Sequence, residues 1–263
     1  MPPTRAHAKL RPWAVSTLAL LLLAVAWFTL PDPYAQDQLR RLRPAELPYS
    51  LGTDQLGRDL ASRLFSGFLH SVALVSLTFV TTVVLAIPAG LLAARSRRAE
   101  SALDVVGGAV WSLPTLIICL VGFVGAKGQW IEAKFLLLGF FNWVPLYRSV
   151  RDIAKQVQPL PFVTFARAMG MREPGIYLTQ VLPNVLPILL PTMSLNLVSL
   201  FEAEFFVSFL GLSYPDPVPT LGGMLRSGVA YLNINMILLP SLLLSILVLF
   251  AMYKYQQRVS PER

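Results

Sequence analysis

Cysteine, histidine and charge are all scarce in this sequence. Its 263 residues include one cysteine, Cys119, and two histidines, His7 and His70. These numbers exclude a disulfide within the chain and a Cys/His metal cluster built from this chain alone. Charged residues make up 14% of the chain, whereas soluble domains average about 25%. The composition therefore argues against a water-soluble fold.

Motifs for nucleotide and catalytic chemistry are missing as well. The sequence holds no G-x-x-x-x-G-K-[ST] phosphate-binding loop and no Gly-Lys dipeptide, so it cannot bind ATP in the way that such loops do. An integral-membrane enzyme would need a cluster of Asp, His, Ser or Cys at one depth of the bilayer, and the apolar segments contain none. We therefore expect no catalytic residue, no cofactor and no metal site, and a protein that is not an enzyme.

What the sequence does have is long apolar segments. Hydrophobic residues make up 55% of the chain and gather in blocks of about 18 or more, the length that a bilayer selects. Six segments qualify as membrane spans: 13–30, 69–93, 102–124, 135–147, 183–212 and 236–253. The fourth is short, but Trp130 and Trp143 suit its interfaces, and residues 129–133 can extend it. The sequence thus predicts an all-α integral membrane protein with six transmembrane helices, in a single domain over residues 1–263.

The first span has two interpretations. Arg5, Lys9 and Arg11 precede it, as basic residues precede the apolar core of a cleaved signal peptide. However, the run 13–30 is longer than a typical signal-peptide core of about 7–15 residues, and no good small-x-small cleavage site follows it. An uncleaved membrane anchor is the favoured interpretation.

Basic residues are distributed unequally between the two sides of the predicted membrane. The net charge is +8, and 14 of the 22 lysines and arginines lie on the side that holds both termini and the connection between spans four and five. Because basic residues stay on the cytoplasmic side, segments 1–12 and 149–182 and both termini are predicted to be cytoplasmic, and segments 31–68 and 213–235 external. Topology and lipid head groups therefore explain the basic excess, and no nucleic-acid partner is expected.

The predicted cytoplasmic segment 149–182 contains an apolar helix. Residues 163–169 form this helix, which ends at Gly170 in a left-handed cap, and Pro174 opens the next helix. One side carries Val163, Ala166 and Met169, another carries Phe165, Ala168 and Met171, and the charged residues are Arg167 and Arg172. Such a helix either binds a partner, or packs against the chain's own spans and the lipid head groups.

The same segment resembles the EAA loop of ATP-binding-cassette importer permeases. The family pattern is Glu-Ala-Ala, three residues, Gly, nine residues, Ile, one residue and Leu-Pro. The positions that match are Ala166, Gly170, Leu182 and Pro183, and those that depart are Thr164 for Glu, Phe165 for the first Ala and Gln180 for Ile.

Further segments resemble the dipeptide, oligopeptide and nickel branch of these permeases. The run LGTDQLGRD at 51–59, followed by Ser62-Arg-Leu and Gly67, is similar to the external segment of that branch. Its signature after span five is matched by Glu204, the run SFLGL at 208–212, Pro217, Pro219, Gly222 and Met224-Leu225. Its approach to the EAA loop is matched by Trp143, Tyr147, Arg148 and Arg151. The order of these matches along the chain identifies the sequence as a member of this family.

The resemblance implies a multi-pass subunit of the bacterial inner membrane that forms half of a translocation path. The implied partners are a second, homologous permease, two cytoplasmic ATP-binding subunits, an external substrate-binding protein and the lipid bilayer. The implied cargo is a peptide, or nickel or cobalt in free or chelated form. Two alternatives stay open: a membrane scaffold that transports nothing and, within the family, a different small polar cargo.

The resemblance also implies roles for particular residues. An ATPase subunit would bind the 163–173 helix through Val163, Thr164, Phe165, Ala166, Arg167, Met169, Gly170, Met171 and Arg172. Losing Glu at position 164 removes one ion pair, and because exposed pairs typically contribute only ~0.2–1 kcal/mol, we expect this docking to be mainly hydrophobic. Asp54, Arg58 and Asp59 would lie where the binding protein and the other permease approach, or would pair with one another in a self-satisfied loop.

Span five carries the candidates for the translocation path. Pro183, Pro187 and Pro191 recur every four residues, so their missing backbone donors leave carbonyls unpaired along one face. That face points to protein or a watery path, or else the prolines are simple kinks. Glu202 and Glu204 lie near the external end, where they either line the path or reach interfacial water, and the resemblance favours Glu204 for the path.

Overall fold

The computed structural model describes residues 29–46, 49–112, 117, 124 and 130–259. The chain divides into two compact units, Met1–Phe65 and Ser66–Arg263. The predicted cytoplasmic segment 1–12, nearly all of predicted span one and much of the second half of predicted span three lie outside the described residues. The prediction of one domain over residues 1–263 stays a prediction.

The described part of the first unit is mostly loop. It contains the 3-10 helix η1 (Gln38–Arg40) and two isolated β-bridges, Glu46 with Tyr49 and Thr53 with Asp59. The long helix α2 (Leu60–Arg95) begins in the last residues of this unit. The end of the predicted external segment 31–68 is therefore helical.

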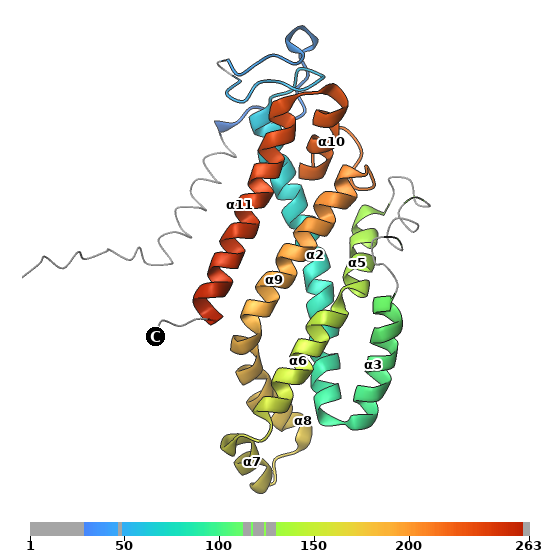
Figure 1. Cartoon of the computed structure of the whole chain (residues 1–263), viewed down its shortest axis with the longest axis vertical. Helices are drawn as coiled ribbons and strands as arrows, with labels where there is room; N and C mark the ends of the chain where they lie inside the picture. The colour runs from blue at the N-terminus through green and yellow to red at the C-terminus, as the bar shows by residue number, and fades with distance from the viewer. Residues whose placement is uncertain (1–28, 47–48, 113–116, 118–123, 125–129, 260–263) are drawn as a thin grey trace, which may run out of the picture. The chain divides into compact units, whose positions relative to one another are not determined.

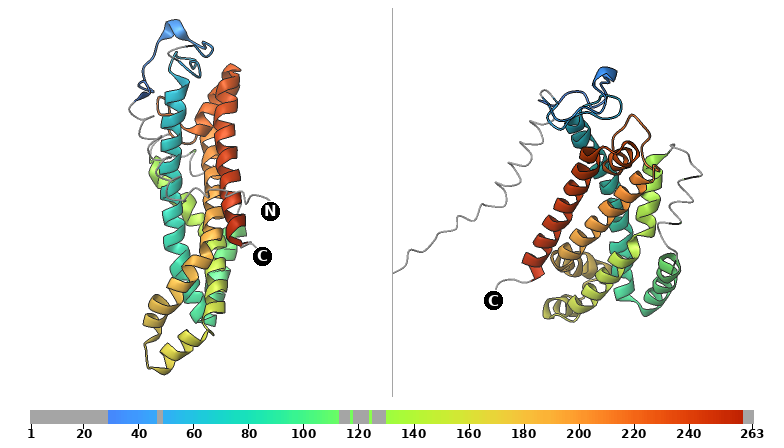
Figure 2. Two further views of the ribbon diagram at one scale, coloured as in Figure 1. Left: turned by 90° about the vertical axis from the view of Figure 1, so that its left-hand side faces the viewer. Right: turned by 45° about the horizontal axis from the view of Figure 1, so that its top comes forward.

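Helices build the second unit. After α2 they are α3 (Arg97–Ser112), α5 (Ile131–Phe141), α6 (Trp143–Val157), α7 (Pro161–Ala168), α8 (Glu173–Ile176), the π-helical turn η2 (Tyr177–Val181), α9 (Leu182–Phe209), α10 (Leu221–Tyr231) and α11 (Ile234–Val259). Figure 1 shows α7, α8 and the α2–α3 turn at one end of this unit, here called the α7 end, and α10 at the other, the α10 end. In both views of Figure 2, α11 runs beside α9. The described ranges contain no extended strand, which confirms the all-α class for them.

Two helices in the described ranges are long and apolar enough to cross a bilayer. They are Leu60–Arg95, which is α2, and the continuous helix Glu173–Phe209, which combines α8, η2 and α9. Helix α11 adds a shorter apolar stretch, Ile234–Phe250. The first helix contains predicted span two, the second contains most of predicted span five, and α11 contains predicted span six. The full count of six spans stays a prediction.

Predicted span four consists of two helices instead of one. The backbone N–H of Asn142 closes α5 by donating to the carbonyls of Leu138 and Gly139, at 3.1 Å each. Helix α6 follows directly and runs past the predicted end at residue 147 to Val157, so the start of segment 149–182 is helical. The prediction ended too early because it counted apolar residues, whereas α6 is amphipathic and buries only one stripe: Tyr147, Val150, Ala154 and Val157.

Glycines and a threonine bring α2 close to α5 and α6. A Cβ atom on Gly90 would lie 2.5 Å from the side chain of Val150, and one on Gly139 would lie 2.6 Å from the carbonyl oxygen of Thr78. The Thr78 hydroxyl also donates to the carbonyl of Phe135 on α5, at 3.1 Å. Close backbone approach and hydrogen bonds of this kind hold helices together in lipid, where apolar burial drives association only weakly.

Polar contacts anchor the loop that precedes α10. The Tyr214 hydroxyl donates to Oε1 of Glu132 on α5 at 2.8 Å. Burial, with this hydrogen bond, raises the pKa of Tyr214 to about 12, so the phenol keeps its proton at neutral pH. The ring of His70 on α2 lies edge-on to Tyr214, and its Nδ1 is 3.1 Å from the Pro219 carbonyl oxygen. The predicted external loop 213–235 is thus fixed to α2 and α5, and part of it is the helix α10.

Candidate functional site

The predicted coupling helix is present as α7 and has well-defined ends. It starts at Pro161, whose fixed φ suits the first helical turn, two residues before the predicted start. At its other end the N–H of Met171 donates to the Ala166 carbonyl (3.2 Å) and the N–H of Gly170 to the Arg167 carbonyl (3.1 Å). This is a Schellman cap, which needs a left-handed residue, and Gly170 supplies it with φ +79°. The next helix, α8, has Pro174 in its first turn, as predicted.

Helix α7 has one buried and one exposed apolar side. Val163 and Ala166 are buried in the core shared with α6 and α9, whereas Phe165 and Met169 are 66% and 73% exposed. The prediction that Met169 shares a side with Val163 is wrong: Val163 is buried and Met169 exposed, because six residues along the helix turn Met169 about 120° away from Val163. The exposed side chains are Phe162, Phe165, Met169 and Met171, and we call this set the α7 apolar surface.

The polar groups of α7 are satisfied within the chain. Arg167 Nε lies 2.7 Å from Oε1 of Glu173, an ion pair that joins α7 to α8 and raises the pKa of Arg167. The Thr164 hydroxyl donates back to the Pro161 carbonyl at 2.9 Å. Arg172 is exposed. At the position where the family pattern has Glu, this chain therefore presents a neutral side chain turned onto its own helix.

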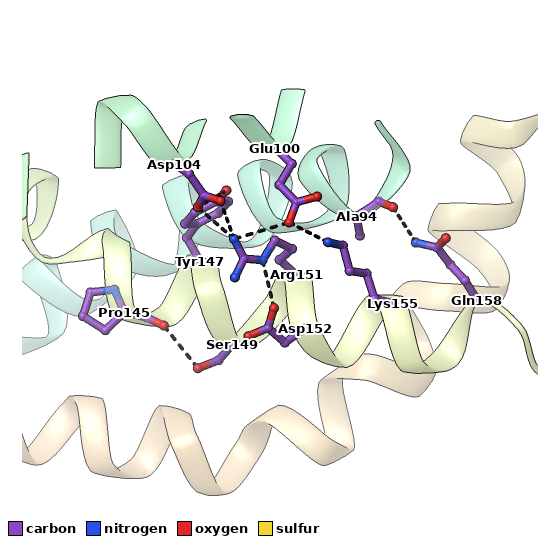
Figure 3. Close-up of polar contacts among 10 residues, drawn as sticks. All are labelled: Ala94, Glu100, Asp104, Pro145, Tyr147, Ser149, Arg151, Asp152, Lys155 and Gln158. Carbon is purple, nitrogen blue, oxygen red and sulfur yellow. Dashed lines mark hydrogen bonds and ion pairs between the residues drawn. The ribbon is translucent and has the colours of Figure 1, made fainter. Parts of the chain in front are cut away.

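A group of charged residues connects the helix before α7 to its neighbour (Figure 3). Two acids one turn apart on α3 face two bases one turn apart on α6. Arg151 Nη1 lies 2.8 Å from both carboxylate oxygens of Asp104 and 3.6 Å from Glu100, whose Oε1 also contacts Lys155 Nζ at 2.5 Å. We call these four residues the α3–α6 ion-pair cluster. Arg151 matches the family pattern in the sequence, but its partners Glu100 and Asp104 on α3 were not predicted.

The predicted path residues of span five have different surroundings. Pro183 and Pro187 are exposed and Pro191 is half-buried, while Val185 and Leu189 on the opposite side are buried. The chain enters this part of α9 through the π-helical turn η2, a local departure from α-helix that is frequent at functional sites. In the second unit the proline face is therefore open.

The two predicted carboxylates of span five are separated. Glu202 is exposed, whereas Glu204 is 1% exposed and accepts a hydrogen bond from the Ser208 hydroxyl at 2.6 Å. A Cβ on Gly222 of α10 would lie 2.1 Å from the Phe205 carbonyl oxygen, so α10 packs closely on this part of α9. The alternative in which Glu204 simply reaches interfacial water does not fit this burial.

The three residues of the first unit that were predicted to contact a partner, Asp54, Arg58 and Asp59, are buried. Asp54 and Arg58 are 0% exposed and form an ion pair of 2.6 Å, and Arg63 Nε lies 3.2 Å from the same carboxylate. Asp59 is also buried and accepts a hydrogen bond from the backbone N–H of Ser62 at 2.8 Å. These contacts favour the alternative of a self-satisfied loop, and contact of these side chains with a partner protein stays a prediction.

Comparison with known proteins agrees with these features. Residues 86–261 match the family described as binding-protein-dependent transport system inner membrane component. A putative peptide transport system permease protein of Brucella abortus is 29% identical over 227 residues, which cover 86% of this chain and 76% of the relative. The oligopeptide transport system permease protein OppC of Mycobacterium bovis is 30% identical over 227 residues, which cover 84% of this chain and 78% of the relative.

Solved structures show the same fold. A chain of the MetNI methionine ABC transporter, in a crystal form described as inward facing, superposes with a TM-score of 0.63 at 18% identity. The superposition covers 76% of this chain and 97% of that chain. The family match over residues 86–261 and the shared helical fold establish that this chain belongs to the binding-protein-dependent inner membrane components, the permease subunits of bacterial ATP-binding-cassette importers, and is a transport subunit without enzymatic activity.

Proposed function

We propose that this chain forms half of the translocation path of an ATP-driven peptide importer. It pairs with a second, homologous permease, two ATP-binding subunits and an external substrate-binding protein. The relatives are named as peptide and oligopeptide permeases, and these names favour peptides over the nickel or cobalt complexes that the sequence left open. The path would run along the open proline face of α9, with Pro183, Pro187 and Pro191.

The observation that carries this proposal is the α7 apolar surface. Phe165 and Met169 are largely exposed on a helix that begins at Pro161, ends in a Schellman cap and is fixed to α6 and α8. Burying one such side chain against a partner contributes about 1.5–3 kcal/mol, whereas an exposed ion pair contributes ~0.2–1 kcal/mol. Docking of α7 on an ATP-binding subunit is therefore mainly hydrophobic, and it does not need an acid at position 164.

The α7 end faces the cytoplasm in this proposal. Arg95, Arg97 and Arg98 at the α2–α3 turn are exposed there, together with Arg167 and Arg172. Exposed arginines next to span ends favour the cytoplasmic side. Both termini are then cytoplasmic, and α10 and the first unit's loop are external.

Charge placed on the α7 apolar surface tests the docking. In the coexpressed importer, Phe165→Asp and Met169→Asp are each expected to abolish copurification of the ATP-binding subunits, because a buried carboxylate would replace an apolar contact. Thr164→Ala is expected to leave copurification unchanged. Leu232→Asp is the matched control, since Leu232 is 87% exposed at the α10 end. Full copurification with both α7 variants would overturn hydrophobic docking.

Uptake into vesicles tests the cargo. Vesicles that hold the assembled importer and its binding protein are given labelled dipeptide or chelated nickel, with and without ATP. We expect ATP-dependent uptake of the dipeptide, and uptake of nickel alone would contradict the peptide assignment. The scaffold alternative predicts uptake of neither cargo. It also predicts that Pro187→Ala has no effect, whereas the same substitution is expected to change uptake without changing assembly if Pro187 lines the path.

A further inference from the structure

The α3–α6 ion-pair cluster has a structural role. The side chain of Arg151 is 15% exposed and that of Asp104 is 39% exposed, and the Arg151 guanidinium lies 5.7 Å from the ring centre of the buried Tyr147. The Tyr147 hydroxyl donates to Asp104 Oδ1 at 3.1 Å, so one carboxylate receives both the arginine and the phenol. Charge-assisted hydrogen bonds of this kind are stronger and more directional than neutral ones.

Among the residues that the structure describes, helix α3 has few contacts besides this cluster. Among its residues only Gly107 is buried, where a Cβ atom would be 3.4 Å from Val144 of α6. A glycine contributes no side chain to a core. Leu103 and Val110 are partly buried. The α3 contacts on α6 are therefore mainly ionic on the side toward the α7 end.

The last turn of α6 has a second polar attachment, to α2. Gln158 Nε2 donates to the Ala94 carbonyl at 2.9 Å. Ala94 belongs to the last turn of α2, where carbonyls lack donors within the helix. The end of α6 is thus tied to both arms of the α2–α3 hairpin (Figure 3).

The connection from α6 to α7 is short and stiff. Pro159 and Leu160 lie in this connection, and Pro161 directly follows as the first residue of α7. Two prolines so close together restrict the backbone. The Leu160 N–H also donates to the Val157 carbonyl at 3.1 Å. If α7 is displaced, α6 must therefore move with it.

We propose that the α3–α6 ion-pair cluster joins the α2–α3 hairpin to α6 and α7 as one rigid body, and that Arg151 is a positioning residue for coupled transport. This inference rests on the proposed docking of α7 on an ATP-binding subunit. Movement of α7 during the ATPase cycle then shifts α2 and α3 together with α6. Breaking the cluster separates ATP hydrolysis from uptake while the ATP-binding subunits stay bound, because the α7 apolar surface is unchanged.

Charge reversal tests this inference in the assembled importer. Arg151→Glu is expected to lower dipeptide uptake per ATP hydrolysed roughly tenfold, within the range of measured coupling between sites, with full copurification of the ATP-binding subunits. Asp104→Arg combined with Arg151→Glu restores the pair with its signs exchanged and is expected to recover most of the loss. A double variant no better than either single variant would overturn the proposal.

Milder variants keep the test valid if charge reversal prevents folding. Asp104→Asn and Tyr147→Phe remove a charge or a hydroxyl at nearly constant volume, and both are expected to lower uptake per ATP. Asp152→Asn is the matched control. Asp152 also contacts Arg151, with Oδ1 2.8 Å from Nε, but it lies on α6 itself and joins no second helix. Equal effects of Asp104→Asn and Asp152→Asn would contradict the positioning role.

The distance between two spin labels tests this inference independently of the proposed cargo. Labels at Ser101→Cys on α3 and Gln156→Cys on α6, both exposed, are introduced with Cys119→Ser. Their distance is expected to stay constant between nucleotide-free and vanadate-trapped importer, and to change on trapping when Arg151→Glu is added. A change in the protein with Arg151 intact would overturn the rigid body. If the importer hydrolyses ATP but takes up no dipeptide, only the cargo assignment fails, and this distance still decides the inference.

Discussion

Gly90 and Gly139 are two of the residues at which helices of the second unit pack closely against each other. Gly139→Ala would place a Cβ atom 2.6 Å from the backbone oxygen of Thr78, so one of the two helices must shift. Overpacking of this kind costs typically about 1–3 kcal/mol. We expect a clear fall in the thermal unfolding temperature in detergent. Gly108→Ala, where nothing lies within 4 Å of the new Cβ, is expected to leave that temperature unchanged or raise it, and equal falls for both variants would contradict the packing.

At the scale of the element, α7 depends on the left-handed residue that ends it. Gly170 has φ +79° and nothing within 4 Å of an added Cβ, so Gly170→Ala strains the backbone without a clash, at a cost of about 1–2 kcal/mol. We expect faster amide hydrogen exchange at Met171, whose N–H closes the cap, and weaker association of the ATP-binding subunits. Gly170→Asn is expected to retain both better, because Asn tolerates this conformation. Unchanged exchange in Gly170→Ala would contradict this account.

The elements that the sequence predicted well are those with one dominant signal. Continuous apolar runs placed α2 and α9, and the predicted helix 163–169, ended by Gly170, lies within two residues of the bounds of α7. The break at Asn142 was missed because Pro145 was taken as an ordinary kink, whereas it lies in the first turn of α6, where a proline is tolerated. Met169 was placed on the same side as Val163 because a spacing of i, i+3, i+6 was taken as one face, although two steps of three residues turn about 120° around the helix. The pairing of Asp104 with Arg151 depends on residues far apart in the sequence, which periodicity cannot bring together.

For the whole molecule, the proposed orientation predicts which exposed residues face the outside of the cell and which face the cytoplasm. With Cys119→Ser as background, Leu232→Cys at the α10 end and Phe165→Cys on α7 are 87% and 66% exposed in the chain. A membrane-impermeant thiol reagent is expected to label Leu232→Cys in intact spheroplasts and Phe165→Cys only after permeabilisation. The reverse pattern would invert the topology. Labelling of Phe165→Cys is also expected to fall when the ATP-binding subunits are coexpressed, because they cover it.

The two bases between α3 and α6 differ in how firmly they are held, so ionic strength should weaken their attachments to α3 one after the other. Lys155 is 42% exposed in its side chain and contacts one oxygen of Glu100, which is 23% exposed. Arg151 is 15% exposed and contacts both oxygens of Asp104, which is 39% exposed, as well as Glu100, so dissolved ions displace the single Lys155 contact more readily. At about 0.15 M salt the screening length is roughly 8 Å, and partly buried charges are screened less than exposed ones. Rising salt would therefore weaken the Lys155 contact first and leave Arg151 as the last attachment, so that α3 loosens in two steps.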